Sequence, residues 1–307
     1  MKNHNLSCYK VAIGMCVKNS ETLIQRTVES VLNQDFPRTD MELIVVDGFS
    51  QDKTVEIIRS YLEGVDMKTR IFCENEGLGR ARQLVVENAM AEYIVWVDGD
   101  MVLSKDFVRL QVEFMERNPS VGVAKGKYGT FKNHGQSLVA NLENIWLILF
   151  MGVEGETTRK ALGASGCIYR VKAIKQAGNF DPNMKGAGED NDAENRIRKA
   201  GWRLCVTSAL FFEMRRQTWG SLWKEYFWHG KGARDILGKD KQMINLYKML
   251  PPVALFAELA RVPEAYKLTH QKAVLFLPLH YVFKRIAWFC GLSSALLQKD
   301  TRKTKLL

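Results

Sequence analysis

Two aspartates, one residue apart, close an apolar run of this 307-residue sequence. Asp98-Gly99-Asp100 follows residues 93–97, which read as a buried strand. Two carboxylates beside such a strand are costly unless a cation or hydrogen-bond donors satisfy them. Mg²⁺ and Mn²⁺ prefer oxygen ligands and also bind substrate phosphates, so the spacing indicates a site for a divalent ion and a phosphate. Taken alone, the same two acids also suit a solvated turn.

Two further polar positions follow neighbouring apolar runs. Asp47 ends the run 43–46 and precedes Gly48, so its carboxylate either accepts from a base or ribose hydroxyl or belongs to an ordinary turn. Arg82 lies in the first turns of a helix predicted over residues 79–89, where free N–H groups and a guanidinium suit a phosphate. A solvated arginine is the alternative. The segment lacks the G-x-G-x-x-G fingerprint, so a dinucleotide-binding fold is not indicated.

A third acidic cluster runs from Glu189 to Asp192 and opens another predicted helix. Acids at a helix N-terminus are favourable for capping and for the helix dipole alone. That explanation does not account for Gly186-Ala187-Gly188 directly before them, which suits a mobile active-site segment.

The elements that must position these residues alternate through the first half of the chain. Strands are predicted at residues 11–17, 43–46, 71–73 and 93–97, with helices between them that start at an N-capping Ser20, near Ser50 or Asp52, and at Gly79. This order predicts a parallel sheet with right-handed crossovers, whose ligands bind beyond the C-terminal strand ends. The second half is less regular, with strands expected at 121–128, 167–170 and 204–207.

Composition indicates one large domain, or one domain with a C-terminal extension. The net charge of +10 either favours anionic partners such as nucleotides, lipid phosphates or nucleic acid, or only keeps the protein soluble. Six cysteines without a C-x-x-C pair indicate small buried side chains in a reducing compartment. We expect no secretory signal, since the first residues carry no apolar segment.

The character of the chain shifts after about Trp219, where tryptophans and basic residues interleave. Two apolar runs follow, at residues 273–283 and 286–297, with Lys284 and Arg285 between them. Each run is shorter than the roughly 20 residues that span a bilayer. Read as one segment, the two runs would place Lys284 and Arg285 near the middle of a membrane, where charges are expensive. We therefore expect an interfacial helix pair with basic residues at the headgroups; packing on the domain or at a dimer interface is the alternative.

Together and in order, these motifs resemble family 2 glycosyltransferases with the GT-A fold. The resemblance covers about residues 9–235 and is carried by residues 11–19, 30–34, 42–54, 75–77 with Ala81 and Arg82, 98–100, and 178–181 running into Glu189 and Asp190. It implies an α/β GT-A domain over 1–235, with a Rossmann-like, mostly parallel sheet flanked by helices. Its nucleotide-binding half would be about 9–103 and its acceptor half about 104–235, with an apolar and basic helical extension over 236–307.

The resemblance also implies roles for single residues. Asp190 matches the catalytic base, and Glu189 beside it is the second expected catalytic residue, which contacts the acceptor or the base. Asp98 and Asp100 match the ribose and metal sites for Mg²⁺ or Mn²⁺; Glu213, near where many relatives carry histidine, is a further candidate ligand. The other residues expected to bind the nucleotide-sugar are Asn19, Asp47, Arg82, Gly99, His229, Lys231 and Arg234.

Some positions depart from the family pattern. Phe49 follows Asp47-Gly48 where acids or glycine are more common, which puts base or sugar contacts in question. Residues 228–234 resemble a basic stretch that closes over the diphosphate, but they lack the Q-x-x-R-W signature of processive polysaccharide synthases. We therefore expect one sugar per acceptor.

The implied activity is that of an inverting, hexosyl-transferring enzyme of class EC 2.4. It would move a single sugar from a UDP- or GDP-linked donor to a lipid-linked acceptor, a polyprenyl phosphate or lipid-linked glycan, in cell-envelope or glycan biosynthesis. We expect a peripheral protein at the cytoplasmic face of the membrane, with a homo-oligomer possible and no nucleic-acid partner; a soluble or polysaccharide acceptor is the alternative.

Two functions of other classes remain. A nucleotidyltransferase would need an N-terminal phosphate loop rich in glycine and arginine, and Lys18-Asn19-Ser20 is not one. A non-catalytic basic module binding membrane or nucleic acid leaves the three groups of acids without a role.

Overall fold

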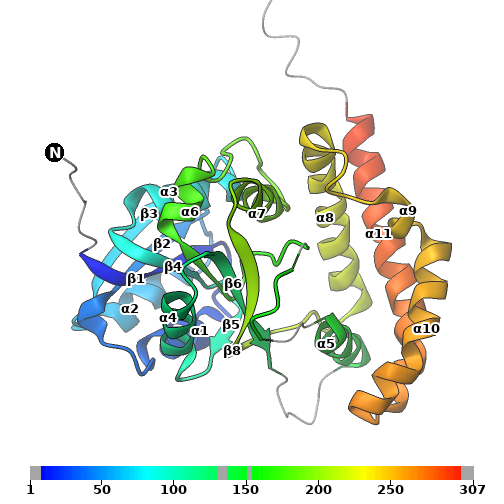
Figure 1. Ribbon diagram of the computed structural model, residues 1–307, viewed down its shortest axis with the longest axis horizontal. Coiled ribbons are helices and arrows are strands. Elements are labelled where there is room, and N and C mark those ends of the chain that lie inside the picture. The colour runs from blue at the N-terminus through cyan, green and yellow to red at the C-terminus, as the bar shows by residue number, and fades with distance from the viewer. Residues whose placement is uncertain (1–7, 130–136, 151–153, 159, 299–307) are drawn as a thin grey trace, which may run out of the picture. The chain divides into compact units, whose positions relative to one another are not determined.

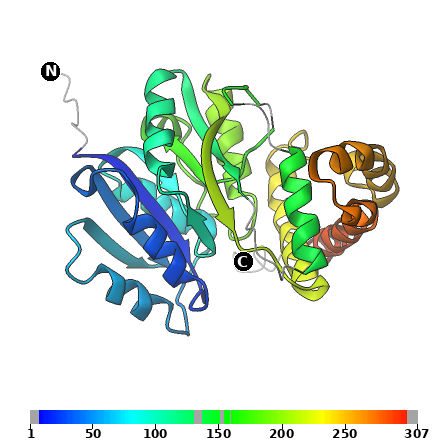
Figure 2. The same cartoon turned by 90° about the horizontal axis from the view of Figure 1, so that it is seen from below.

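The computed structural model describes residues 8–129, 137–150, 154–158 and 160–298, which form two compact units (Figures 1 and 2). The sheet unit comprises Met1–Phe131, Met151–Lys185 and Glu189–Met214. The helical unit comprises Lys132–Phe150, Gly186–Gly188 and Arg215–Leu307. This division falls at Met214, whereas the sequence analysis expects a boundary near residue 235, and it assigns two internal segments to the helical unit.

Within the described residues, an eight-stranded sheet forms the centre of the sheet unit, in the order β3-β2-β1-β4-β7-β6-β8-β5. The strands are β1 (Tyr9–Val17), β2 (Met41–Asp47), β3 (Lys68–Cys73), β4 (Ala91–Trp96), β5 (Met101–Leu103), β6 (Val121–Tyr128), β7 (Cys167–Arg170) and β8 (Arg203–Glu213). The strands β3, β2, β1 and β4 are parallel, as predicted. Beyond β4 the sheet is mixed, because β7 is antiparallel to both of its neighbours and β5 is antiparallel to β8, while β6 and β8 are parallel.

Helices cover both faces of this sheet, because successive strand residues point to opposite faces and both sets are apolar. One face packs against α1 (Ile24–Leu32), α2 (Thr54–Leu62) and α4 (Phe107–Arg117). The other packs against α3 (Leu78–Asn88), α6 (Val171–Gln176) and α7 (Glu189–Lys199). A short 3₁₀ turn, η1 (Arg38–Asp40), precedes β2. With both faces buried, polar side chains of the central strands gather where the strands end.

The loops after β1 and β2 are tied together at this edge. Ser20 does not cap α1 as predicted; the helix begins at Ile24, and the Ser20 N–H donates to Thr54 Oγ1 at 2.7 Å. The N–H and hydroxyl groups of Thr54 both donate to Asp52 Oδ1, at 3.0 and 2.5 Å, where α2 starts. Ser20 is therefore bonded to the first turn of α2, and α1 begins without a side-chain cap.

The helical unit is built from α5 (Leu138–Phe150), α8 (Trp219–Lys239), α9 (Leu246–Met249), α10 (Pro251–Thr269), η2 (Lys272–Phe276) and α11 (Leu277–Leu297). Glycines let α8 and α11 approach closely. A Cβ at Gly230 would lie 1.9 Å from the Trp288 carbonyl oxygen, and one at Gly291 would lie 2.0 Å from the Phe227 carbonyl oxygen. The two backbones touch where side chains usually separate helices.

Lys284 is buried inside the helical unit and does not lie at a headgroup. Its Nζ is 2.7 Å from Glu143 Oε1 on α5 and 4.1 Å from the centre of the Trp146 ring. His280 Nε2 lies 3.0 Å from the same carboxylate oxygen. Burial by itself would raise the pKa of Glu143. Lys284 and His280 outweigh this effect and lower the pKa to about 2. The prediction that both basic residues face lipid headgroups is wrong for Lys284, because a carboxylate and an aromatic ring inside the unit satisfy its charge.

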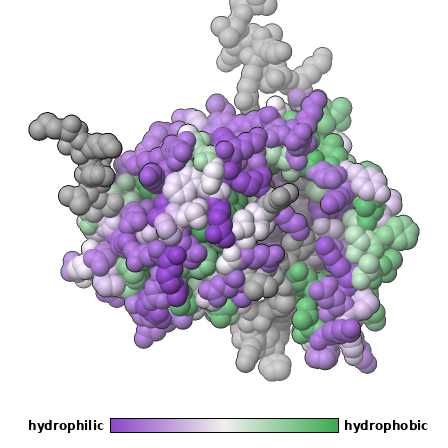
Figure 3. All heavy atoms as spheres, in the orientation of Figure 1, coloured by the Kyte–Doolittle hydropathy of each residue, from purple (hydrophilic) through white to green (hydrophobic). Residues whose placement is uncertain are grey.

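The two apolar runs form one helical stretch and not the predicted pair of helices. Among the described residues, 272–297 is the one stretch long and apolar enough in composition to cross a membrane, and 44% of its most apolar window is buried within the protein. The core helices of soluble proteins can have the same length and composition, so these two properties alone do not identify a membrane span. Exposed apolar side chains nevertheless remain on α10 and around η2, including Phe256 (70% exposed), Leu275 (67%) and Leu279 (63%). Figure 3 shows this apolar surface in green at the right.

Substitution of Gly230 by alanine is expected to lower the free energy of unfolding by about 1–3 kcal/mol, since the added methyl overlaps the Trp288 carbonyl oxygen and pushes α8 from α11. Gly238→Ala is the matched control on the same helix, because open space surrounds Gly238 and alanine favours helices. Urea denaturation of both variants measures the difference. Equal effects would contradict the close approach.

Candidate active site

Most of the predicted acids lie at one edge of the sheet. β2 ends at Asp47, and Asp98-Gly99-Asp100 connects β4 to β5. Because β2, β1 and β4 are adjacent and parallel, their C-terminal ends meet there. A Cβ at Gly99 would lie 2.9 Å from Ser20 Oγ, so the glycine lets the loop after β1 approach the two aspartates.

Asp47 is held by the turn that follows it. Only 3% exposed, it accepts the Ser50 N–H at 3.1 Å and the Ser50 hydroxyl at 2.6 Å. Asn19, at a φ of 49°, donates its N–H to Ser50 Oγ at 2.9 Å and accepts from the Gln51 N–H at 2.8 Å. Phe49, at a φ of 58°, leaves half of its surface exposed beside them. The turn therefore fixes Asp47 and Asn19 and presents one exposed aromatic ring.

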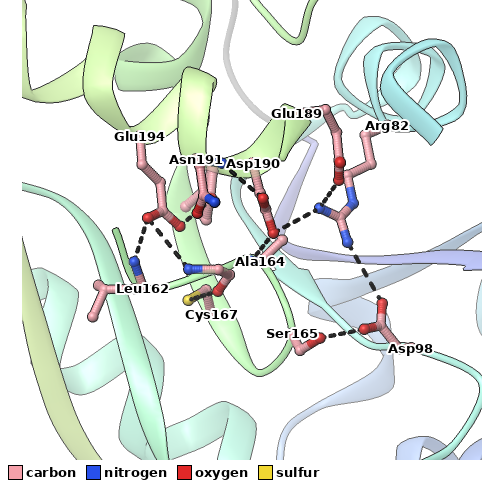
Figure 4. Close-up of polar contacts among 12 residues, drawn as sticks. Arg82, Asp98, Leu162, Ala164, Ser165, Cys167, Glu189, Asp190, Asn191 and Glu194 are labelled. Atoms are coloured by element: carbon pink, nitrogen blue, oxygen red, sulfur yellow. Dashed lines mark hydrogen bonds and ion pairs between the residues drawn. The ribbon is translucent and has the colours of Figure 1, made fainter. Parts of the chain in front are cut away.

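One arginine joins the acids of the strand edge to the acids that open α7 (Figure 4). Arg82 on α3 is 4% exposed; its Nη1 pairs with Glu189 and lies 3.4 Å from Asp190 Oδ2. Its Nη2 lies 3.7 Å from Asp98 Oδ1. The charge of Arg82 is thus directed at three carboxylates, and its expected contact with a diphosphate stays a prediction.

A glycine at the start of α3 brings Arg82 to this position. A Cβ at Gly79 would lie 2.2 Å from the Asp181 carbonyl oxygen, and the Gly79 N–H donates to the Met184 carbonyl at 3.0 Å. The first turn of α3 therefore lies directly against residues 181–185, shortly before α7 begins.

A segment that the sequence analysis did not identify completes the site. We call residues 162–166, which directly precede β7, the bridging loop. The Ala164 N–H donates to Asp190 Oδ2 at 3.0 Å, and the Ser165 hydroxyl donates to Asp98. Gly163 and Gly166 have φ values of 74° and 67°. Two glycines three residues apart, directly before the strand at 167–170, are the available sequence signal.

The carboxylates around Arg82 differ in their affinity for protons. Burial raises the pKa of Glu189 to about 8, even though Arg82 opposes the change. Burial also raises the pKa of Asp98. For Asp190 burial is outweighed by Arg82 and by two backbone N–H donors, so its pKa is lowered. Near neutral pH, an ionised Asp190 therefore lies beside a glutamate that readily holds a proton.

The candidate metal ligands lie around the connection between β4 and β5. Met101 pairs with Glu213 across β5 and β8, and the Met214 N–H donates to the Asp100 carbonyl at 3.0 Å. In the part of the chain that the structure describes, no three His, Cys, Asp or Glu side chains gather into a group that could hold a metal by themselves. Mg²⁺ and Mn²⁺ often take one or two protein carboxylates and complete their shell with water and phosphate oxygens, and binding of such an ion here stays a prediction. Besides burial, the charge of Glu213 raises the pKa of Asp98, a repulsion that a cation would relieve.

The remaining predicted residues, His229, Lys231 and Arg234, belong to the helical unit and lie on the continuous helix α8. Arg234 Nη1 donates to the Ala295 carbonyl on α11 at 3.2 Å, and Lys231 Nζ lies 5.2 Å from the centre of the Phe227 ring. Their contribution to nucleotide binding stays a prediction.

Comparison with known proteins places the chain in a family. The sequence matches the profile described as "Glycosyl transferase family 2" over residues 12–177, more than half of the chain. It is 25% identical over 259 residues to a poly-beta-1,6-N-acetyl-D-glucosamine synthase of Staphylococcus epidermidis, covering 82% of this chain and 61% of that protein. It is 22% identical over 292 residues to the probable glycosyltransferase YdaM of Bacillus subtilis, covering 92% and 64%. The chain thus spans about three fifths of the length of these relatives.

Solved structures resemble most of the chain. A mannosyltransferase, PcManGT from Pyrobaculum calidifontis in complex with GDP-Man and Mn²⁺, matches with a TM-score of 0.66 and 18% identity, covering 95% of this chain and 88% of that chain. Residues 1–349 of Staphylococcus aureus TarS in complex with UDP-GlcNAc match with a TM-score of 0.51 and 19% identity, covering 91% and 81%. At these identities the likeness shows the fold, and it confirms the predicted GT-A class.

Replacement of Glu189 by glutamine is expected to change how stability depends on pH. A pKa of about 8 in the folded state, against an ordinary value near 4.5, means that the wild type loses stability as pH rises between these values. Glutamine does not titrate, so the variant should gain on the order of 1 kcal/mol or more over the wild type across this window, because one pKa unit is about 1.4 kcal/mol.

Urea denaturation at several pH values from about 5 to about 8 measures this difference. Glu87→Gln is the control, since Glu87 lies at the surface, 3.1 Å from Arg80. A stability difference that stays constant with pH would show that Glu189 is ionised throughout.

Proposed function

Since the chain belongs to glycosyl transferase family 2, we propose that it is an inverting glycosyltransferase that uses a nucleotide-diphosphate sugar as donor. The convergence of Asp98, Glu189 and Asp190 on Arg82, beyond the ends of parallel strands, carries this proposal. The structures with GDP-Man and UDP-GlcNAc that share the fold support a nucleotide-sugar donor.

The donor site is proposed at the edge formed by β1, β2 and β4. Asp47 and Asn19, fixed by the turn after β2, would bind the base and ribose. Asp98, Gly99 and Asp100 would lie against the ribose and diphosphate. A Mg²⁺ or Mn²⁺ ion bound by Asp100, with Asp98 or Glu213, would stabilise the charge of the departing diphosphate.

Asp190 is the proposed base for a hydroxyl acceptor. Its lowered pKa keeps it ionised, its side chain is 20% exposed, and the Ala164 N–H fixes one of its oxygens. The carboxylate would take the hydroxyl proton as the acceptor oxygen bonds to the anomeric carbon and the bond to the diphosphate breaks. Attack from the face opposite the leaving group inverts the configuration.

We further propose transfer of one sugar to a lipid-linked acceptor, a polyprenyl phosphate or a lipid-linked glycan, at the cytoplasmic face of a membrane. The net charge of +10 and the exposed apolar side chains of α10 and α11 support this location. A polysaccharide acceptor is the alternative, since the S. epidermidis relative is named as a synthase of poly-beta-1,6-N-acetyl-D-glucosamine.

Donor binding is expected to require a divalent ion and Asp100. In thermal unfolding with UDP- and GDP-linked sugars, one donor should raise the Tm only when Mn²⁺ or Mg²⁺ is present. Asp100→Ala should abolish that metal-dependent rise and lower transfer by about 100-fold or more, since charge on the leaving group is then less stabilised. Asp66→Ala, an exposed aspartate before β3, is the control. Absence of stabilisation by any nucleotide diphosphate with metal would contradict the proposed function.

Exchange of Asp190 for asparagine separates the two acceptor classes. A sugar hydroxyl needs a base, so transfer to it should fall by about 100- to 10,000-fold. The oxygen of a polyprenyl phosphate is already anionic, so transfer to it should stay within about 10-fold. Radiolabelled transfer to polyprenyl phosphate in anionic vesicles and to soluble oligosaccharides measures both, with donor-induced stabilisation as the check on folding. Near-normal transfer to a hydroxyl would exclude the base role.

A further inference from the structure

The bridging loop bonds to acids from two different parts of the site. Its Ala164 N–H holds Asp190, and the hydroxyl of the next residue, Ser165, holds Asp98 (Figure 4). Because the two donors are consecutive along the chain, the position of one constrains the other. The loop therefore sets the spacing between the proposed base and the proposed diphosphate site.

A buried lysine holds the carbonyl groups of this loop. Lys125 on β6 is 5% exposed, and its Nζ donates to the carbonyl oxygens of Leu162 at 2.8 Å and Gly163 at 3.1 Å. The residues that the structure describes give Lys125 no ion pair with a carboxylate. A buried ammonium is costly unless its interactions compensate. The two carbonyl groups supply part of that compensation, together with the rings of Tyr128 and Phe211, whose centres lie 5.1 and 5.8 Å from Nζ.

A buried glutamate holds the N–H groups of the same two residues. Glu194 on α7 is fully buried, and its Oε2 accepts from the N–H groups of Leu162 at 2.5 Å and Gly163 at 3.4 Å. Its other oxygen accepts the Tyr169 hydroxyl at 2.7 Å. Asp190 lies one helical turn before Glu194, so both face the loop from the same side of α7.

We propose that Lys125 and Glu194 are positioning residues for the transfer reaction. The Lys125 ammonium donates to the carbonyl groups and the Glu194 carboxyl oxygen accepts from the N–H groups, so together they align the peptide groups at Leu162 and Gly163. This alignment fixes Ala164 and Ser165 against Asp190 and Asp98.

Both side chains are buried and bond to the peptide groups of the loop, so we assign their main effect to the position of the loop. The charge of Lys125 also acts on Asp190, whose pKa it helps to lower. We call Lys125 and Glu194 the clamp. This inference rests on the proposed function, because the clamp is proposed to set the spacing of the reacting groups.

Lys125→Met, of similar length but without a charge or donor, tests the clamp. With the donor identified by thermal unfolding, kcat should fall by about 10- to 100-fold, because a displacement of the order of 1 Å between reacting groups costs this much. The KM for the donor should change less than kcat, since Asp47 and Asn19 are held by other bonds and only Asp98, through Ser165, depends on the loop. Lys172→Met, an exposed lysine on α6, is the matched control.

A double variant adds a measurement that a merely structural role would not change. Glu194→Gln keeps the shape of the side chain and removes its charge, and it serves alone if Lys125→Met fails to fold. If both residues act through one loop, the double variant should lose little more kcat than either single variant, whereas independent effects multiply.

The failure of this inference is distinguishable from failure of the proposed function. A wild type that transfers sugar, with variants that lose Tm but keep kcat, or whose effects multiply, would overturn the clamp and leave the function standing. A wild type that no nucleotide-sugar and metal stabilise would overturn both, before any variant is measured.

Discussion

A buried guanidinium facing three carboxylates is the constraint on which the site depends. If Asp98, Glu189 and Asp190 are all ionised, Arg82 neutralises only one of them. Buried charge of one sign is costly, so the cluster needs a proton, further donors or a bound cation. The donors of the bridging loop offset part of this cost, and the raised pKa of Glu189 favours the proton that removes one negative charge. A divalent ion near Asp98 and Asp100 would offset more of it.

As a result, the pKa values of two neighbouring residues, Glu189 and Asp190, are shifted in opposite directions. Glu189 is 1% exposed and depends mainly on Arg82, so burial dominates and its pKa rises. Asp190 receives the Ala164 N–H as well, and its pKa falls. Environments that push the pKa values of two acids apart assign them different tasks. Here one carboxylate is free to accept a proton while its neighbour limits the negative charge around it.

The sequence predicted the elements whose signal is local. Apolar runs such as β1 and β4 are unmistakable because both faces of the sheet are covered, and aspartates at their ends stand out by contrast. Features with distant partners were missed: Ser20 bonds to Thr54, 34 residues away, and Lys284 bonds to Glu143, 141 residues away. The bridging loop was not predicted for another reason. Most of its bonds are made by backbone groups, which every residue type supplies, so its sequence carries little signal of its role.

The balance of buried charges differs between the helical unit and the candidate site in the sheet unit. In the helical unit one carboxylate, Glu143, faces Lys284 and His280, and its pKa falls to about 2, the behaviour of a satisfied pair. In the sheet unit one cation serves three acids, and the pKa of Glu189 rises to about 8. Burial is similar in both places, so burial alone does not mark function. An uncompensated excess of negative charge at the ends of parallel strands is the feature on which the proposed site rests, because a cation, a transferred proton or a hydrogen-bond donor can relieve it.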